Sequence, residues 1–373
     1  MKKNKLISIV IIIVIVISAF SIYYVKTKPI YVAFSAGLSG QWSQLGVQVR
    51  NGFIQGVDDI NSNGGVNGHK IIPIIFDDKN DNEYAKTLLN TLNEQNIDYL
   101  IGFTLSSMTP ATEHFLSESN ILIFSPTMST NLLSGLDDNF FRICNPSSHE
   151  AYSLLDVLKK DGLKDFAIVY DTSNWQYTKP LYDTIVNSKT KYDLNLVYEE
   201  AFDSHNIDFN ELSNRLINSK AKQIVILSSG VDTAQIAQRL QLNNNTAILY
   251  ASAWATTKDL ISNGGTAVEN MRLNGLYDFN STNPKSIAFE NKMIAKYGNK
   301  PSFPQLFGYE TISILAKSME SSKSLDVISV KKSILKTSSF EGLQENIAFD
   351  EFGDPFRPYF IYTVKNGEFI SFD

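Results

Sequence analysis

The sequence predicts an α/β protein made of two doubly wound parallel-sheet lobes joined by a hinge and preceded by an N-terminal apolar helix. From Ile30 onward, apolar runs of strand length alternate with amphipathic runs of helix length, the pattern of parallel sheets with helical crossovers. The chain has 373 residues, more than one hydrophobic core usually spans. Its composition, 43% apolar and 19% charged, is that of a globular protein. We therefore expect two lobes.

The first cycle of elements begins with the strand Ile30 to Ser35. Leu45, Val49 and Phe53 then recur at helical spacing, and Gly64-Gly65 ends that helix. Further strands are expected at 69–76, 99–103, 121–124 and 140–143, and further helices near 82–95, 109–119 and 130–136.

A second cycle begins after Pro146. Its strands are expected at 166–170, 196–199, 223–227 and 247–250, and its helices near 149–161, 177–190, 208–219 and 232–242. The D-x-x-E spacing from Asp208 to Glu211 is that of a capping box and supports one helix start. Beyond Leu273 we expect a strand to Phe279, then the helices 285–297, 305–320 and 326–337, and last an apolar pair at 347–349 and 358–364.

The first 28 residues carry an export signal. A basic start, Met1-Lys2-Lys3-Asn4-Lys5, precedes an uncharged apolar run from Leu6 to Val25. This run fits either a cleavable signal peptide or an uncleaved membrane anchor, because it is as long as a spanning helix and also contains Ala19-Phe20-Ser21. Both alternatives place the rest of the chain outside the cytoplasm, in the periplasm or on the extracellular face of the membrane.

Several classes of protein are disfavoured. The formal net charge is −6, and the part after residue 28 is more acidic still because the first 28 residues hold lysines and no acids, so no nucleic-acid partner is expected. The four histidines lie outside H-E-x-x-H and C-x-x-C contexts, and no G-x-S-x-G or P-loop occurs. We therefore expect no catalysis, no metal and no cofactor. The single cysteine, Cys144, is expected to be a small buried hydrophobe.

A specific resemblance is carried by short motifs that run through the chain. They include Ala36-Gly37-Leu38-Ser39-Gly40, Asp58-Asp59-Ile60-Asn61, Gly64 to Lys70, Phe76-Asp77-Asp78, Phe124-Ser125-Pro126, Phe141-Arg142 and Phe349-Asp350 with Gly353-Asp354. In this order they resemble the branched-chain amino acid binding proteins of ABC importers, which have the type I periplasmic binding fold. The resemblance covers residues 30–373. It implies a solute-binding protein that closes around a small molecule.

Ligand residues in the first lobe are expected at the carboxyl ends of its strands, where a doubly wound sheet leaves a crevice. Ser106 and Ser107 follow the strand at 99–103, and Thr127 and Ser129 follow the strand at 121–124. Taken singly, each of these residues is equally compatible with a helix N-cap. The family resemblance implies both roles for Ser106, Thr127 and Ser129.

In the second lobe the candidates are mostly aromatic. Trp175 stands where the family usually has an aromatic that covers the ligand, and Ser229 and Trp254 are further candidates. Trp42, in the loop after the first strand of the first lobe, is another candidate. The resemblance also implies an acid in the loop after the strand at 247–250, but this chain reads Ala251-Ser252-Ala253-Trp254-Ala255. Unless another acid, such as Asp171 or Asp232, substitutes, we expect an amide, an aromatic acid or a short organic acid rather than an α-amino acid.

The predicted organisation assigns residues 1–28 to the signal peptide or anchor, 30–145 and 253–339 to lobe 1, and 146–252 and 340–373 to lobe 2. The expected function is capture of a small organic ligand and its delivery to an ABC permease in the membrane. The alternative is a receptor subunit that senses the ligand and signals to a membrane partner. Both use the same open-to-closed change of the lobes.

Overall fold

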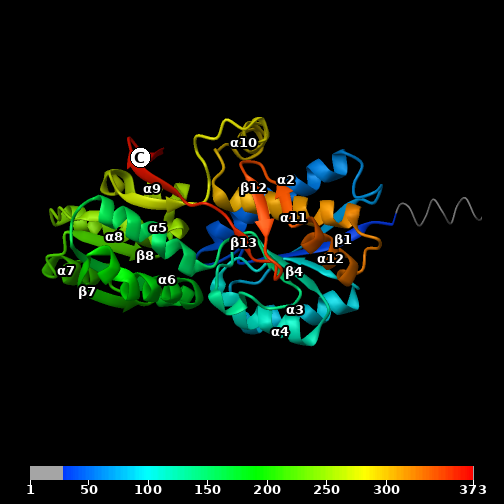
Figure 1. The fold of residues 1–373 in the computed structure, drawn as a ribbon, viewed down its shortest axis with the longest axis horizontal. Coiled ribbons are helices and arrows are strands. Elements are labelled where there is room, and N and C mark those ends of the chain that lie inside the picture. Colours follow the sequence, from blue (N-terminus) through cyan, green and yellow to red (C-terminus); the bar gives the residue numbers. More distant parts are fainter. Residues whose placement is uncertain (1–27, 373) are drawn as a thin grey trace, which may run out of the picture.

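A five-stranded parallel sheet forms the centre of the first lobe in the computed structural model, which describes residues 28–372 (Figure 1). The strand order is β2-β1-β3-β4-β5. The strands are β1 (Ile30–Ala36), β2 (Ile71–Asp77), β3 (Tyr99–Ile101), β4 (Leu122–Ser125) and β5 (Phe140–Arg142). The helices joining them are α2 (Ser43–Ser62), α3 (Asn82–Glu94) and α4 (Thr109–Glu118). The central strands β3 and β4 are buried along their whole length because helices cover both faces of the sheet.

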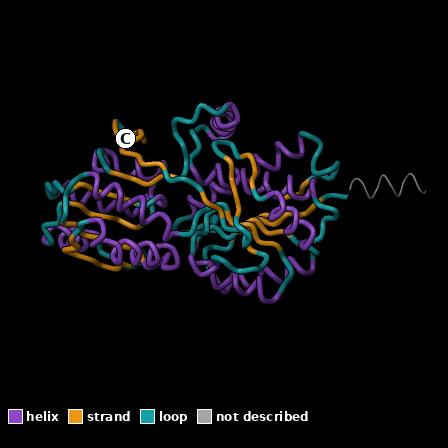
Figure 2. Tube along the Cα trace, in the orientation of Figure 1, coloured by secondary structure: helices purple, strands orange, loops and turns teal. Residues whose placement is uncertain are grey.

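The second lobe is built on a seven-stranded sheet of order β15-β14-β10-β9-β8-β6-β7. Its parallel part consists of β6 (Asp165–Asp171), β7 (Asn195–Phe202), β8 (Gln223–Leu227), β9 (Ile248–Ala251) and β10 (Arg272–Gly275). The strands β14 (Phe360–Lys365) and β15 (Glu368–Ser371) extend it in antiparallel fashion. Its helices are α5 (Ser147–Lys160), α6 (Trp175–Ser188), α7 (Phe209–Asn218), α8 (Gly230–Leu242) and α9 (Lys258–Gly264). The predicted α/β architecture is confirmed, with helices on both sides of each sheet (Figure 2).

Most of the predicted elements lie where the sequence placed them. The helix expected near 130–136 is wrong, because that segment forms only the short 3-10 turn η2 (Asn131–Leu133). Thr130 caps this turn by accepting a hydrogen bond from the Leu132 N–H, and Gly135 follows at a positive φ of 69°. A positive φ two residues after the turn does not continue a helix.

The first lobe is completed by residues from the C-terminal part of the chain. These form α10 (Pro284–Tyr297), α11 (Phe303–Ser321) and α12 (Val327–Thr337). Helix α11 packs on α2 through glycines: a Cβ at Gly52 would lie 1.8 Å from the Gln305 carbonyl oxygen, and one at Gly308 would lie 2.1 Å from that of Val49. The absence of side chains at these positions lets the two helix backbones approach each other closely.

A third sheet of three strands lies against the first lobe. Its strands are β11 (Ser339–Glu341), β12 (Asn346–Phe349) and β13 (Pro355–Phe356). The ring of Phe349 packs on those of Phe124 and Phe141 at 5.9 and 6.5 Å. Asp354 adds a buried ion pair to Arg142 at 2.7 Å, which ties the end of this sheet to β5.

This arrangement corrects the predicted lobe boundaries in the second half of the chain. The sequence assigned 253–339 to the first lobe, but β10 pairs with β9 in the second sheet. It assigned 340–373 to the second lobe, but of this range only β14 and β15 join the second sheet. Apolar runs locate strands without naming their partners, and sheet membership is set by long-range pairing. Within the described residues, the chain passes between the lobes at 143–146, 276–283 and 357–359.

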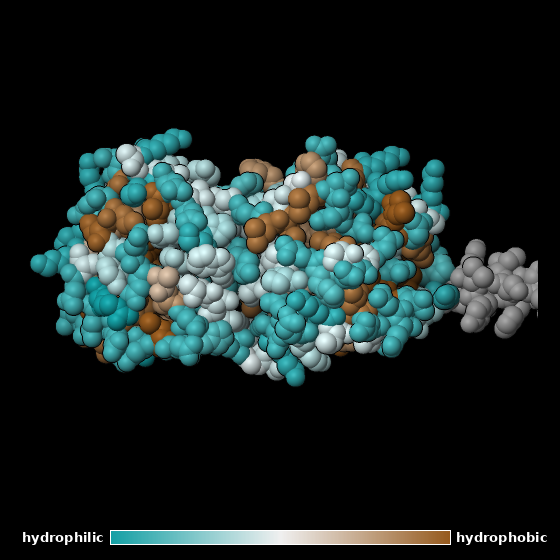
Figure 3. All heavy atoms as spheres, turned by 90° about the horizontal axis from the view of Figure 1, so that it is seen from below, coloured by the Kyte–Doolittle hydropathy of each residue, from teal (hydrophilic) through white to brown (hydrophobic). Residues whose placement is uncertain are grey.

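On the face that Figure 3 shows, hydrophilic side chains spread across both lobes with apolar patches between them. Within residues 28–372, none of the helices combines the length and the apolarity needed to cross a membrane. The predicted N-terminal apolar helix lies in residues 1–27, outside the described part of the chain.

Candidate ligand-binding site

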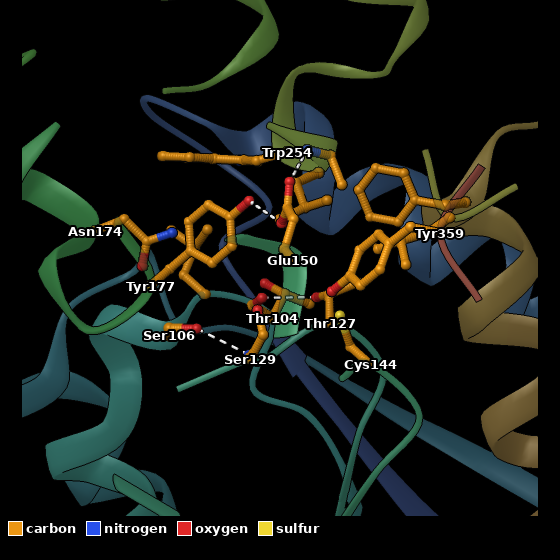
Figure 4. Close-up of a pocket in the computed structure, with 15 residues that line it drawn as sticks. Thr104, Ser106, Thr127, Ser129, Cys144, Glu150, Asn174, Tyr177, Trp254 and Tyr359 are labelled. Atoms are coloured by element: carbon orange, nitrogen blue, oxygen red, sulfur yellow. Dashed lines mark hydrogen bonds between the residues drawn. The ribbon is translucent and has the colours of Figure 1, made fainter. Parts of the chain in front are cut away.

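A cavity lies between the two lobes at the carboxyl ends of their strands (Figure 4). The first lobe lines it with Leu45, Thr104, Leu105, Ser106, Thr127, Ser129, Cys144 and Phe303. The second lobe and the crossing segments add Glu150, Asn174, Tyr177, Ala253, Trp254, Leu276 and Tyr359. The space available between the lining side chains is about 30 Å³, which is about the size of a water molecule. A larger molecule therefore enters only if the lobes separate.

The polar part of the lining from the first lobe consists of hydroxyl groups that are held by hydrogen bonds to the backbone. The Thr127 hydroxyl donates to the Thr104 carbonyl oxygen at 2.6 Å, and the Ser106 hydroxyl accepts from the Ser129 N–H at 3.0 Å. The two loops meet because β3 and β4 are hydrogen-bonded neighbours that end at the same edge of the sheet. Fixed in this way, the Ser106 O–H and the lone pairs of Thr127 can hydrogen-bond a polar ligand group.

The opposite side holds a carboxylate that sequence reasoning missed. Glu150 lies in the first turn of α5 and is 1% exposed. Its carboxylate accepts hydrogen bonds from the Tyr177 hydroxyl at 2.8 Å and from the Ala253 N–H at 2.6 Å, and Asn274 approaches at 3.4 Å. These partners come from α6, from the 3-10 turn η5 (Ala253–Ala255) and from β10. Three elements of the second lobe thus converge on one side chain.

Burial controls the protonation of Glu150. Removal from water raises the pKa of Glu150 to about 7, and the bonds from Ala253, Tyr177 and Asn274 oppose this rise. Burial and the neighbouring Glu150 raise the pKa of Tyr177 well above its ordinary value, so its hydroxyl remains a donor. Of the residues that line the cavity, Glu150 alone has an acidic or basic side chain that ionises near neutral pH, and Lys, Arg and His are absent from this lining.

Glu150 places a carboxylate beside the loop 251–255, which has no acidic residue of its own. The carboxylate accepts a hydrogen bond from the Ala253 N–H of that loop, so the acid is supplied by helix α5 and not by the loop itself. One signal in the sequence could have revealed it. Glu150, Leu154 and Leu158 recur at intervals of four in α5, and the two leucines are buried, so Glu150 is a charged residue on the apolar face of a helix.

Asp171 and Asp232, the predicted substitutes, have other roles. Asp171 caps the 3-10 turn η3 (Thr172–Asn174) and accepts from the Ser173 N–H and hydroxyl at 2.9 and 2.7 Å. Asp232 accepts from the Ser229 hydroxyl at 2.6 Å. Burial raises the pKa of both aspartates. Neither of them lines the cavity.

Aromatic rings form much of the rest of the lining. Trp254, in η5, meets Tyr177 edge to face with 5.8 Å between ring centroids. Trp254 is 8% exposed, and Phe303 and Tyr359 line the cavity from α11 and the crossing at 357–359. Rings fixed in this way can contact the apolar part of a ligand.

The predicted site residues fall into two groups. Ser106, Thr127, Ser129 and Trp254 line the cavity. The other four, Ser107, Trp175, Trp42 and Ser229, do not line it.

Ser107 acts through its backbone, because its N–H donates to the Asn174 side chain at 2.9 Å and its carbonyl accepts from Asn82. Trp175 is 45% exposed and lies near Tyr170 and Lys179 on the rim of the second lobe. The lining role falls to its neighbours Asn174 and Tyr177, because α6 begins at Trp175 and turns that side chain away.

Trp42 and Ser229 line a smaller space beside the main cavity, together with Leu45 and Trp254. Cys144 is 4% exposed and lines the main cavity, and burial raises the pKa of its thiol to about 11. It therefore stays protonated at neutral pH. Among residues 28–372, no cluster of three or more His, Cys, Asp or Glu side chains is placed to hold a metal ion.

Two lobes on parallel sheets, with a cavity at the strand ends between them, define the class of periplasmic binding proteins. The chain belongs to this family, since the model described as periplasmic binding protein matches residues 29–368.

Among curated proteins, the chain is similar to the leucine-, isoleucine-, valine-, threonine-, and alanine-binding protein of Pseudomonas aeruginosa. The two are 23% identical over 96% of this chain and 93% of the relative. A Leu/Ile/Val-binding protein homolog of Brucella melitensis is 22% identical over 91% and 92%.

Solved structures share the fold. A leucine binding protein from Thermotoga maritima superposes with a TM-score of 0.85 at 22% identity and covers 92% of this chain and 98% of that one. A branched-chain amino acid transporter substrate binding protein from Streptococcus pneumoniae, in complex with isoleucine, has the same TM-score and coverages at 19% identity. A solute binding protein from R. palustris in complex with benzoate has a TM-score of 0.83 at 17% identity, over 92% and 95%.

Proposed function

We propose that this protein captures a small organic ligand, an amino acid, an amide or a short organic or aromatic acid, between its lobes and delivers it to an ABC importer. The observation that carries the proposal is the cavity between the lobes, with hydroxyls on the first lobe and the Glu150 carboxylate and the rings of Tyr177 and Trp254 on the second. Similarity to proteins named as binding branched-chain amino acids supports both the capture and the delivery.

The charges around the cavity rank these ligand classes. A buried carboxylate without a counter-ion is costly, and Glu150 faces a space lined by no cationic side chain. A ligand that brings an ammonium or an N–H donor to Glu150 would offset this cost. A ligand with only a carboxylate would instead be repelled by the ionised form of Glu150. We therefore place amino acids and amides ahead of simple acids, which reverses the order expected from the loop at 251–255.

The test is a thermal-shift screen of the purified protein against amino acids, amides, aromatic acids and short organic acids. A ligand at 100 times its dissociation constant stabilises the folded state by about 2.7 kcal/mol, which is readily measured. A shift with amino acids or amides is the expected result. Shifts with simple acids alone would contradict the ranking, and no shift in any class would contradict the proposal.

Two variants then locate the bound ligand. Tyr177→Phe removes the hydroxyl that donates to Glu150, and Thr127→Val removes a hydroxyl from the opposite side. Each should weaken binding about tenfold or more while the protein stays folded, since a buried polar group loses a partner. Glu113→Gln, at an exposed position of α4, is the matched control and should leave affinity unchanged.

A further inference from the structure

Trp42 crosses the opening between the lobes. It belongs to the first lobe, in the loop between β1 and α2, yet its ring packs on two residues of the second lobe. The His205 ring lies edge to face with it at 4.8 Å, and the Trp254 ring does so at 6.1 Å. The Trp42 Nε1–H also points at the Asp232 carboxylate, at 3.4 Å. One indole from the first lobe thus lies between two aromatic rings and an acid of the other lobe.

The backbone at Trp42 is strained in order to present this side chain. Its φ is 58° and its ψ is 13°, which is left-handed geometry that favours glycine and is unusual for a bulky residue. Strained backbone of this kind persists where surrounding contacts compensate for it. Trp42 makes no side-chain cap for α2, and its side chain contacts His205, Trp254 and Asp232 of the second lobe, which can offset this strain.

Trp42 does not line the cavity, so its contacts are with the lobes and not with the space a ligand would fill. Trp42 is connected to the residues that line the cavity through the ring of Trp254. Trp254 lies between Trp42 and Tyr177, and Tyr177 donates to Glu150. These rings form a continuous packed series from the first lobe, across the opening, to the carboxylate of the second lobe.

We propose that Trp42 is a positioning residue that latches the two lobes together and thereby sets ligand affinity without touching the ligand. Gln41 and Gln48 flank the latch with hydrogen bonds to Ser204 and Asp259 of the second lobe, at 3.4 and 3.2 Å. Both of these contacts are long or exposed, whereas Trp42 brings a large apolar area. The effect on affinity rests on the proposed function, but the latch itself acts in the ligand-free protein.

The test measures the distance between the lobes in the full chain by double electron–electron resonance, without any ligand. Spin labels at Glu113→Cys in α4 and Asn187→Cys in α6 would report on opening, since both positions are exposed and the native Cys144 is buried. The protein with the native Trp42 should show a population at short distance. In Trp42→Ala the ratio of closed to open molecules should fall about tenfold, since two aromatic contacts are lost.

Three further variants separate the latch from a general loss of structure. Trp42→Phe keeps a ring and loses the Nε1–H, so it should give an intermediate distribution. Trp42→Gly relieves the positive φ, so it should fold at least as well as Trp42→Ala and open equally far. Trp175→Ala removes a tryptophan whose aromatic and cation–π partners, Tyr170 and Lys179, belong to its own lobe, and it should match the unsubstituted distribution.

The latch would be refuted if Trp42→Ala left the short-distance population unchanged. It would also be refuted if the protein with the native Trp42 showed no short-distance population. These outcomes are independent of the ligand screen. A latch upheld together with a silent screen would refute the proposed ligand classes alone. A positive screen with an unaltered distance distribution would refute the latch alone.

Discussion

The first lobe meets the cavity with the ends of two neighbouring strands, whereas the second lobe meets it with helices α5 and α6 and the turn η5. On the first side, Ser106 and Thr127 are placed by the pairing of β3 with β4. On the second side, Glu150 and Tyr177 are placed by how the helices pack on the sheet. A strand end is located by a local pattern, but a helix side chain reaches the site only through tertiary packing. The two sides should therefore respond differently to substitution.

Glu150→Ala should have the largest effect on stability. It leaves the Ala253 N–H and the Tyr177 hydroxyl without their acceptor in a buried place, and we expect a loss of about 2–3 kcal/mol. Urea unfolding followed by circular dichroism measures this loss. Glu113→Ala, at an exposed glutamate, should change the free energy of unfolding by less than about 0.5 kcal/mol. Equal effects in the two variants would show that the second side is not organised by Glu150.

Ser106→Ala should have a smaller effect on the other side of the cavity. The buried Ser129 N–H loses its acceptor, at a cost of about 1–2 kcal/mol. Its neighbour is a matched control, because Ser107→Ala keeps the backbone contacts to Asn174 and Asn82 and should be close to neutral. If urea unfolding gave the same free energy of unfolding for Ser106→Ala and Ser107→Ala, the proposed role of the Ser106 hydroxyl would be wrong.

The pH dependence of stability should distinguish the sides as well. The pKa of Glu150 is raised by burial from 4.5 to about 7, so the folded state binds this proton more tightly than the unfolded chain does. Stability from this group is present in full below about pH 4.5 and is lost as pH rises towards 7. Glu150→Gln cannot titrate, so its melting temperature should fall less than that of the unsubstituted protein between about pH 5 and 8. Thr127→Val should retain the original slope.

Trp175→Ala should have the smallest effect. The side chain is 45% exposed and lies outside the cavity, so the change in free energy of unfolding should be about 0.5 kcal/mol or less. Ligand affinity, measured by isothermal titration calorimetry with a hit from the screen, should be unchanged. A large loss of affinity would place Trp175 over the ligand after all.

Sequence patterns predicted the two α/β lobes and the hydroxyl side of the site because both depend on local periodicity and on where strands end. They did not predict the partner of β10, since an apolar run does not name its neighbour in a sheet. Glu150 was missed for a related reason. Glu150 matters because it bonds Ala253, about a hundred positions away in the sequence. The only nearby signal in the sequence is that Glu150 is an acid on the apolar face of α5. Trp175 was predicted and Tyr177 was not considered, because the register of α6, which decides which side chain turns inward, cannot be read from the sequence.

The close packing of α2 on α11 also affects how the protein folds during synthesis. The faces of Gly52 and Gly308 meet with almost no side chain between them, yet more than two hundred residues separate them. As the chain leaves the ribosome from its N-terminus, the first sheet is made long before the helix that covers α2. In the meantime the whole second sheet up to β10 is synthesised. The first lobe therefore cannot complete its core until almost the whole chain is available, so a chain that ended before α11 would leave the apolar face of α2 uncovered.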